Sequence, residues 1–225
     1  MALVNVIPDL GGSFEYLTRA GPRAKIGMAR GRGSATGSTG QAFAWVSVEG
    51  GDGGIAAGTL EVEVGGRDDV FDGAGWSVVV GPKTRFAIRG NIRYTIAGRS
   101  WSGEIATRAV SPEDVAESRG HDGRLIRTSV ADGPLVCGET VHEPGGWAAW
   151  PSHTHDHEAV FLYRLSDPDG FAIQVLENKD GGSRAELVTD GDVRRIRGGL
   201  HPVVAAPAGR AVTTWVLAPT AQTKP

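Results

Sequence analysis

The residues best suited to chemistry lie in the stretch WPSHTHDHE, residues 150–158, which holds three of the six histidines of the chain. His153 and His155 are two positions apart, so in a strand both imidazoles point from the same face. Two converging imidazoles suit zinc, iron, manganese, nickel or copper. A third could come from His201, which follows a Gly-Gly turn and opens an apolar segment. Glu158 and Asp156 could add a carboxylate.

The same histidines also allow a plainer interpretation, because an isolated His-X-His pair is more often part of a solvated polar turn. The order of the surrounding segments favours a metal site. The pair follows a Gly-Gly-Trp turn, and an apolar strand, a Gly corner and the isolated His201 come after it. That order is typical of a cupin barrel, so we expect a real or ancestral metal site. By contrast, His121 and His142 are expected at polar loop positions.

The elements that would position these side chains are short segments in which apolar and polar residues alternate. These segments predict an all-β chain. Apolar and polar residues alternate in runs of four to nine that end at Gly or Pro, which is the pattern of half-buried strands closed by turns. Before residue 110 such segments are AFAWVSVEGG (42–51), GTLEVEVGG (58–66), WSVVVGP (76–82), TRFAIRG (84–90) and IRYTIAGRS (92–100). After it, similar segments run from RLIRTSV to AVTTWVLAP.

The two halves of the chain have similar patterns, which favours two tandem β-barrels or jelly rolls. We expect an N-terminal barrel over residues 1–110 and a C-terminal barrel with the metal site over 111–225. The link at 110–118 should contain a helical turn with Ser111 as its cap and Pro112 at its first position. The Gly/Ser-rich segment 29–41 is predicted to be a mobile loop.

Composition excludes several classes of function. The net charge is −3 with no basic block, so neither nucleic acid nor an anionic membrane is an expected partner. No apolar run is long enough to span a bilayer, and the first residues do not resemble a signal peptide. Cys137 is the single cysteine, which excludes an internal disulfide and a thiolate cluster. We therefore expect a cytoplasmic protein with a small-molecule substrate.

Three blocks of sequence are similar to those of a known family. GGWAAWPSHTHD, YRLSDPDGFAIQ and GDVRRIRGGLHPVVAAPAG resemble the 5-deoxyglucuronate isomerases of inositol catabolism, which are related to the 5-keto-4-deoxyuronate isomerases. The similarity extends over about residues 55–220 and includes a VFDG turn in the first half. It implies a bicupin, with a divalent metal in the C-terminal barrel. Zinc is the metal it implies, with iron or manganese as alternatives.

The resemblance implies His153, His155, His201 and a glutamate as metal ligands. Matching the following strand puts Ala159 at the position of the family's glutamate and Glu158 one residue earlier. An offset of one residue turns a strand side chain to the opposite face, so Ala159, Phe161 and Tyr163 should point inward and Glu158 should not. Three outcomes stay open: a register shift that recovers Glu158, a site completed by His157 or water, or loss of the metal.

Other positions bear on the substrate. The family has an arginine where Val175 stands, and its absence predicts a changed pocket. For an isomerisation, a base must reach the α-proton of the substrate, and Glu158, Tyr163 and His157 are the candidates. Gln174 could orient a substrate hydroxyl. The alternative for Tyr163 is a core aromatic, and for Gln174 a structural hydrogen-bond partner. The tryptophans that flank the histidines, Trp147 and Trp150, could wall a ring-shaped substrate or pack in the core.

Three hypotheses follow from the sequence. The first is a metal-dependent isomerase-like bicupin that acts on a small sugar acid or similar oxygenated substrate. The second is a specialised-metabolism enzyme descended from that family, such as an oxygenase, lyase, cyclase or epimerase. The third is a binding protein that has lost full coordination of the metal. The N-terminal barrel has no histidine, so we interpret it as a structural unit or as a homodimer interface.

Overall fold

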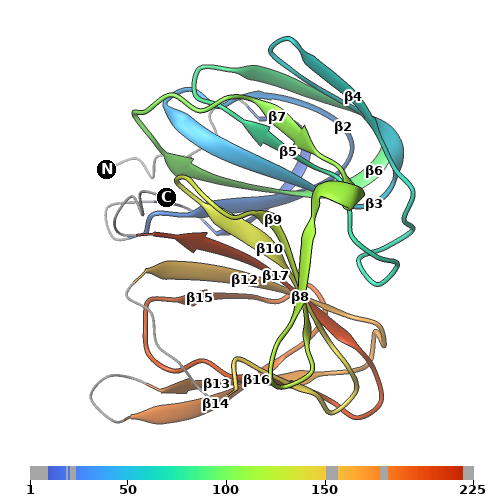
Figure 1. Ribbon diagram of the computed structural model, residues 1–225, viewed down its shortest axis with the longest axis vertical. Coiled ribbons are helices and arrows are strands. Elements are labelled where there is room, and N and C mark those ends of the chain that lie inside the picture. The colour runs from blue at the N-terminus through green and yellow to red at the C-terminus, as the bar shows by residue number, and fades with distance from the viewer. Residues whose placement is uncertain (1–9, 19, 21–23, 151–156, 178–181, 220–225) are drawn as a thin grey trace. The chain divides into compact units, whose positions relative to one another are not determined.

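The structure is a computed structural model that describes residues 10–18, 20, 24–150, 157–177 and 182–219. The chain divides into two compact units, Met1–Val115 and Ala116–Pro225 (Figure 1). The division falls after residue 115, whereas the sequence predicted it after residue 110. Each unit is built from antiparallel strands.

The N-terminal unit has one seven-stranded sheet in the order β1-β2-β6-β3-β5-β7, with β4 paired to β3. Its strands are β1 (Gly11–Thr18), β2 (Gly27–Ser38), β3 (Ala42–Ala57), β4 (Leu60–Val64), β5 (Ser77–Val80), β6 (Arg85–Ser100) and β7 (Arg108–Val110). Val46 and Ile55, from the two halves of β3, belong to the same core cluster. The long strands therefore curl so that both halves of β3 contribute to the same core cluster.

The curl of the long strands explains one difference from the sequence prediction. Residues 84–90 and 92–100 were expected to form two strands, but they form the single strand β6. Gly90 has φ +97° and Gly51 on the paired strand has φ +84°, values that L side chains rarely adopt. These glycines bend β6 and β3 while the pairing between the two strands continues on both sides.

The prediction of a mobile loop at 29–41 is wrong for most of that segment, because residues 27–38 form β2. The small residues of β2 make room for aromatic rings that lie over its backbone. A Cβ on Gly31 would come within 2.6 Å of the Tyr94 ring, and one on Gly37 within 2.5 Å of the Phe86 ring. Both rings belong to β6, so their contact with glycine cannot be read from the sequence of β2 alone.

The link between the units contains the expected helical turn, η1 (Pro112–Asp114), with Pro112 at its start. The backbone N–H of Ser111 donates to Asp114 Oδ2 at 3.2 Å, and its hydroxyl donates to the same oxygen at 2.8 Å. These bonds lower the pKa of the Asp114 carboxyl, because they stabilise its charged form. Ser111 and Pro112 thus occupy the positions that the sequence predicted, whereas the role of Asp114 was not predicted.

The C-terminal unit is a sandwich of two sheets (Figure 1). The six-stranded sheet has the order β15-β12-β17-β10-β9-β8, and the four-stranded sheet the order β11-β16-β13-β14. The strands are β8 (Ala116–Arg119), β9 (Leu125–Val130), β10 (Val136–His142), β11 (Trp147–Ala148), β12 (Glu158–Leu165), β13 (Ala172–Glu177), β14 (Ser183–Val188), β15 (Val193–Ile196), β16 (Val203–Ala205) and β17 (Ala211–Ala218).

The two sheets of this unit share a core. Tyr163 of β12 and Ala211 of β17, in one sheet, pack in the same cluster as Val188 of β14 and Val203 of β16, in the other. The prediction of an all-β bicupin is confirmed by this architecture. In the part of the chain that the structure describes, no helix has the length and hydropathy needed to cross a bilayer.

Candidate functional site

A cavity of about 250 Å³ lies inside the C-terminal unit, and both of its sheets contribute to the wall. The strands place their inward residues around it because side chains of a strand alternate between its two faces. Seven of the twelve lining residues are apolar and five are polar or charged. The lining residues are Arg124, Ile126, Thr140, His142, Ala148, Ala149, Phe161, His201, Val203, Thr213, Trp215 and Leu217.

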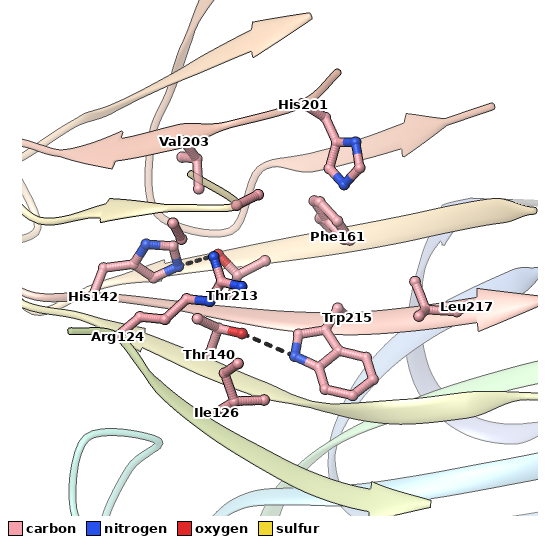
Figure 2. Close-up of a pocket in the computed structure, with 12 residues that line it drawn as sticks. Arg124, Ile126, Thr140, His142, Phe161, His201, Val203, Thr213, Trp215 and Leu217 are labelled. Carbon is pink, nitrogen blue, oxygen red and sulfur yellow. Dashed lines mark hydrogen bonds between the residues drawn. The ribbon is translucent and has the colours of Figure 1, made fainter. Parts of the chain in front are cut away.

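Trp215 of β17 forms one wall of the cavity, and a glycine on the neighbouring strand makes room for it. Gly138 of β10 is the register partner of Trp215, and a Cβ on Gly138 would meet indole Cζ2 at 2.5 Å. The indole N–H donates to Thr140 Oγ1 at 3.0 Å, as Figure 2 shows. The ring is therefore held across β10 and presents an apolar surface to a ligand.

His142, at the end of β10, lies in the cavity wall and is only 1% exposed. Its Nε2 and the Thr213 hydroxyl are 2.9 Å apart (Figure 2). Burial, with a smaller contribution from the charge of Arg124, lowers the pKa of His142 to about 4, so the ring is neutral near pH 7. The prediction that His142 is a polar loop residue is wrong, whereas His121 lies exposed in a turn as expected.

Arg124, which immediately precedes β9, supplies a cation to the wall. Its Nη1 donates to Asp122 Oδ2 at 2.6 Å, and its backbone N–H to Asp122 Oδ1 at 3.3 Å. The Asp122 side chain is 4% exposed and that of Arg124 is 18% exposed. Figure 2 shows the guanidinium beside the hydrogen bond between His142 and Thr213. Asp122 thus fixes the direction of a cation that borders the cavity.

His201 lies on the part of the wall that comes from the other sheet. It follows Gly198 and Gly199, which have φ of +116° and +84°, so the predicted glycine turn is present. Its Nδ1 is 3.0 Å from the Gly199 carbonyl oxygen, and its ring centroid is 5.7 Å from that of Phe161. With Nδ1–H donating to the carbonyl, Nε2 is the nitrogen that would bind a metal. This is the arrangement that metal-binding histidines adopt.

Tyr163 and Gln174, predicted as catalytic, are fully buried and are not among the cavity-lining residues. The Tyr163 hydroxyl donates to Gln174 Oε1. Gln174 Nε2 lies 2.7 Å from the His201 carbonyl oxygen and 3.0 Å from that of Pro202. Burial raises the pKa of the Tyr163 phenol well above its ordinary value, so its proton stays in place. Both residues therefore hold the His201 backbone in place. A core aromatic for Tyr163 and a structural hydrogen-bond partner for Gln174 agree better with these positions than catalytic roles do.

Glu158 lies at the start of β12 in an ion pair with Arg195, and it is not among the cavity-lining residues. Phe161, on the opposite face of the strand, does line the cavity. The register expected from the sequence, with Ala159, Phe161 and Tyr163 inward, is thus the observed one. Arg195 belongs to β15, which pairs with β12, so the structure gives the Glu158 carboxylate a cation as its partner. This geometry favours a metal site in which His157 or water, and not Glu158, is the remaining ligand.

The ligands predicted at His153 and His155 fall outside the described residues, as does Asp156, so the ligand set stays a prediction. Within the described residues, no three His, Cys, Asp or Glu side chains form a group that could hold a metal ion. His201 fits a metal site, because its Nδ1 donates to a carbonyl and its Nε2 would be the ligand atom.

Trp147 and Trp150 do not line the cavity and are 41% and 57% exposed. Their ring centroids are 5.9 Å apart. Ala148, between them in sequence, does line the cavity, so the alternation of β11 directs Trp147 to the other face. Neither of the two predicted roles, substrate wall or core packing, agrees with these positions.

Four residues at this site were not predicted from the sequence: Arg124, Asp122, Thr213 and Trp215. The alternation of AVTTWVLAP carries a signal for two of them, because positions 213, 215 and 217 share one face of β17. No comparable local signal marks Arg124, whose segment RGHDGR has the composition of an ordinary polar turn.

Comparisons with known proteins agree with the fold. The structure resembles an IolB-like protein from Salmonella typhimurium LT2 with a TM-score of 0.86 and 19% identity, over 98% of this chain and 95% of that one. It resembles the Lactobacillus farciminis oxalate decarboxylase with a TM-score of 0.65 and 9% identity, covering 88% and 78%. For AerE from Microcystis aeruginosa the TM-score is 0.63 and the identity 6%, covering 95% and 96%.

At these identities the structural likeness establishes the fold alone. A search of curated proteins gave no match. A sequence model of the KduI/IolB family, however, matches residues 24–224, which is most of the chain. This agrees with the resemblance to 5-deoxyglucuronate isomerases found in the sequence. The chain belongs to the KduI/IolB family.

Proposed function

We propose that this bicupin is a metal-dependent isomerase that interconverts the aldose and ketose forms of a small sugar acid. The observation that carries the proposal is the cavity of the C-terminal unit, in which Arg124 borders a largely apolar wall that also contains His201. A cation in such a wall suits a substrate with one carboxylate. A histidine with Nδ1 bonded to a carbonyl suits a metal.

The metal, zinc in this proposal, would be held by His201 together with His153 and His155, and would supply a Lewis acid that polarises the substrate carbonyl. Arg124 would hold the carboxylate, with its guanidinium fixed by Asp122. The rings of Phe161 and Trp215 would flank the substrate and exclude water, which strengthens electrostatic interactions inside the cavity. The carbon chain of the substrate would thus lie between the metal, which binds its carbonyl, and Arg124, which binds its carboxylate.

The isomerisation also needs a group that removes a proton from the carbon next to the carbonyl and returns it to the neighbouring carbon. Of the three candidate bases from the sequence, Tyr163 is bound to Gln174 and Glu158 to Arg195. The proposal therefore places the base in the segment that leads into β12, which carries His157. Replacement of His157 by Gln should lower kcat without release of the metal.

The test is incubation of the purified protein with 5-deoxyglucuronate and with other uronates in D₂O, followed by NMR. Isomerisation through an enediol should produce the ketose with deuterium at the former aldehyde carbon, because the carbon that loses its proton becomes the ketone carbon. Metal analysis should give about one zinc per chain in wild type. His201→Ala should lose both metal and turnover, while its circular dichroism stays that of a β protein. A zinc-loaded wild type without turnover or exchange on any of these uronates would refute the proposal.

The apolar lining also favours a second candidate function. Ile126, Val203 and Leu217 offer no hydrogen bonds to a polyhydroxylated sugar. A less polar carboxylate, processed by a specialised-metabolism enzyme such as an oxygenase or lyase, would suit these walls. Iron as the bound metal, together with no turnover of uronates, would support this second candidate and contradict the first.

A further inference from the structure

The residues of β17 that line the cavity become less polar along the strand. They are Thr213, Trp215 and Leu217, which are two positions apart and therefore project from the same face, roughly 7 Å from one to the next. Figure 2 shows the guanidinium of Arg124 at the Thr213 end of this row and Leu217 at the other end. A ligand that fills the cavity thus meets a cation and a hydroxyl at one end and apolar surface at the other.

Trp215, in the middle of this row, is held in place by the neighbouring strand β10. Its benzo ring lies over Gly138, where an added Cβ would be 2.5 Å from Cζ2 and 2.8 Å from Cη2. Its indole N–H donates to Thr140 Oγ1 at 3.0 Å. On β12, the register partner of Trp215 is Phe161, which also lines the cavity. Both aromatic residues are only partly buried, so each has apolar surface that a ligand can contact.

The four-stranded sheet supplies small apolar side chains to the same space. Ala148 of β11 and Val203 of β16 line the wall that this sheet contributes. The cavity of about 250 Å³ is smaller than the roughly 300–1,000 Å³ of pockets for drug-sized ligands, so it suits a molecule the size of one sugar ring.

We propose that Trp215 determines the specificity of the cavity by stacking on the apolar face of a ring-shaped carboxylate, such as a sugar acid in its closed pyranose form. The ring would lie against the indole, with its carboxylate directed to Arg124. One face of a pyranose is made of C–H groups, which match the apolar surface of an aromatic ring. Thr140 acts as a positioning residue, because its hydroxyl accepts the hydrogen bond that orients the indole.

A closed ring suits these walls better than an open chain. An open chain would lose the freedom of several rotatable bonds on binding, whereas a six-membered ring is already rigid. The hydroxyls of an open-chain sugar acid would also turn in part toward Ile126 and Leu217, which offer no hydrogen bonds, and burial of such groups without partners is unfavourable. The apolar walls therefore discriminate by the shape of the ligand, while Arg124 recognises its charge.

This inference rests on the proposed function for the role of Arg124, but it concerns binding and not turnover. Val175, at the position where the family has an arginine, is not among the lining residues, whereas Arg124 is. The cation that would hold the carboxylate therefore comes from the turn before β9, at the end of the row that Trp215 does not occupy.

The experiment is calorimetry of the full-length, zinc-loaded protein with three carboxylates. Cyclohexanecarboxylate and heptanoate have the same charge and the same number of carbon atoms, and only the first is a ring. Methyl β-glucuronide is a sugar acid whose acetal keeps the pyranose closed. We expect cyclohexanecarboxylate to bind about tenfold more tightly than heptanoate, because its shape is fixed before binding. Methyl β-glucuronide should also bind, although it cannot open to an aldehyde and cannot be isomerised.

Replacement of Trp215 tests the stacking directly. Trp215→Leu should weaken both ring acids about tenfold, as for the loss of about 50 Å² of apolar contact, and heptanoate less than about threefold. Trp215→Phe should retain part of the affinity for the rings. Trp147→Leu is the matched control, since Trp147 is 41% exposed and does not line the cavity, and it should bind all three acids as wild type does.

Replacement of Thr140 tests the positioning role. Thr140→Val keeps the shape of the side chain but removes the acceptor of the indole N–H, so it should weaken the ring acids more than heptanoate. Thr140→Ser keeps a hydroxyl and should restore most of the affinity. Circular dichroism identifies any variant that is not folded.

Three results would overturn the inference. They are a wild-type protein that binds cyclohexanecarboxylate no more tightly than heptanoate, a folded Trp215→Leu variant that binds the ring acids as wild type does, or an equal loss of ring binding in Trp147→Leu. Failure of the isomerase proposal is a different result, namely a cavity that binds both ring acids through Trp215 but turns over no uronate.

Discussion

The side-chain amide of Gln174 donates to the backbone carbonyl of His201 at 2.7 Å, from one strand of the four-stranded sheet to the segment that carries the proposed metal ligand. The same Nε2 lies within hydrogen-bond distance of the Pro202 carbonyl, and Oε1 accepts from Tyr163. One buried residue therefore joins β12, β13 and the His201 segment. The position of the His201 ring depends on this connection.

Replacement of Gln174 by Met should loosen the His201 segment. The His201 carbonyl and the Tyr163 hydroxyl would lose their hydrogen bonds to Gln174 inside the core, while the Pro202 carbonyl keeps the bond from the Val175 N–H. The cost should be about 2–4 kcal/mol in the free energy of unfolding. Metal affinity should fall about tenfold or more, as for other residues that orient a ligand. Urea unfolding and competition with a chelator measure the two effects. Unchanged metal affinity in a folded Gln174→Met protein would contradict the positioning role.

Replacement of Tyr163 by Phe distinguishes a positioning residue from a catalytic one. The variant loses one hydrogen bond, so its free energy of unfolding should fall by about 1 kcal/mol. Turnover should change less than about fivefold, whereas loss of a general base or acid typically costs a factor of 10²–10⁴. Steady-state kinetics with a uronate provides the measurement. A drop of more than about a hundredfold in kcat, with KM preserved, would restore the catalytic assignment of Tyr163.

The metal site makes opposite predictions for Glu158 and His201. Glu158→Gln should retain the metal, because the carboxylate is bound to Arg195 and does not line the cavity. It should instead destabilise the fold, because the ion pair with the half-buried Arg195 is removed. His201→Ala and His153→Ala should each release the metal. Metal analysis of the three proteins after gel filtration decides between these outcomes, and loss of metal from Glu158→Gln alone would reverse the assignment.

Much of the fold can be predicted from the sequence, because the patterns that identify strands and turns involve only residues close together in the chain. Alternation and glycine corners identify most strands, and the register of β12 follows from the position of its aromatics. His201 was found because a glycine turn and an apolar strand enclose it. These features depend on neighbours within a few residues, which is the range over which a pattern can be read.

The missed features depend on contacts between distant strands. Gly31 and Gly37 give β2 the composition of a flexible linker, and only the structure shows that aromatic rings of β6 lie over them. Arg195 of β15, the partner of Glu158, is 37 positions away along the chain. Arg124 and His142 belong to polar segments that only the folding of the sheets brings to the cavity. Sequence composition assigns such residues to solvated turns, because the partner that changes their role lies elsewhere in the chain.

The buried His142 also predicts how stability depends on pH. Its pKa is about 4 in the folded protein, below the ordinary value of 6.5, so the unfolded chain binds more protons between these two values. Stability from this residue is therefore complete above about pH 6.5 and falls as the pH drops toward 4, by about 3 kcal/mol in all. Urea unfolding of wild type at pH 7 and pH 4.5 should show this loss, on top of contributions from other groups.

The contribution of His142 is isolated by substitution. His142→Asn cannot titrate, so its stability should fall less between pH 7 and pH 4.5 than that of wild type, by up to about 3 kcal/mol. His121→Asn is the matched control, since His121 is exposed in a turn, and it should follow the wild-type curve. If His142→Asn and wild type lose equal stability over this range, the pKa of His142 is the same in the folded and unfolded proteins, and burial does not lower it.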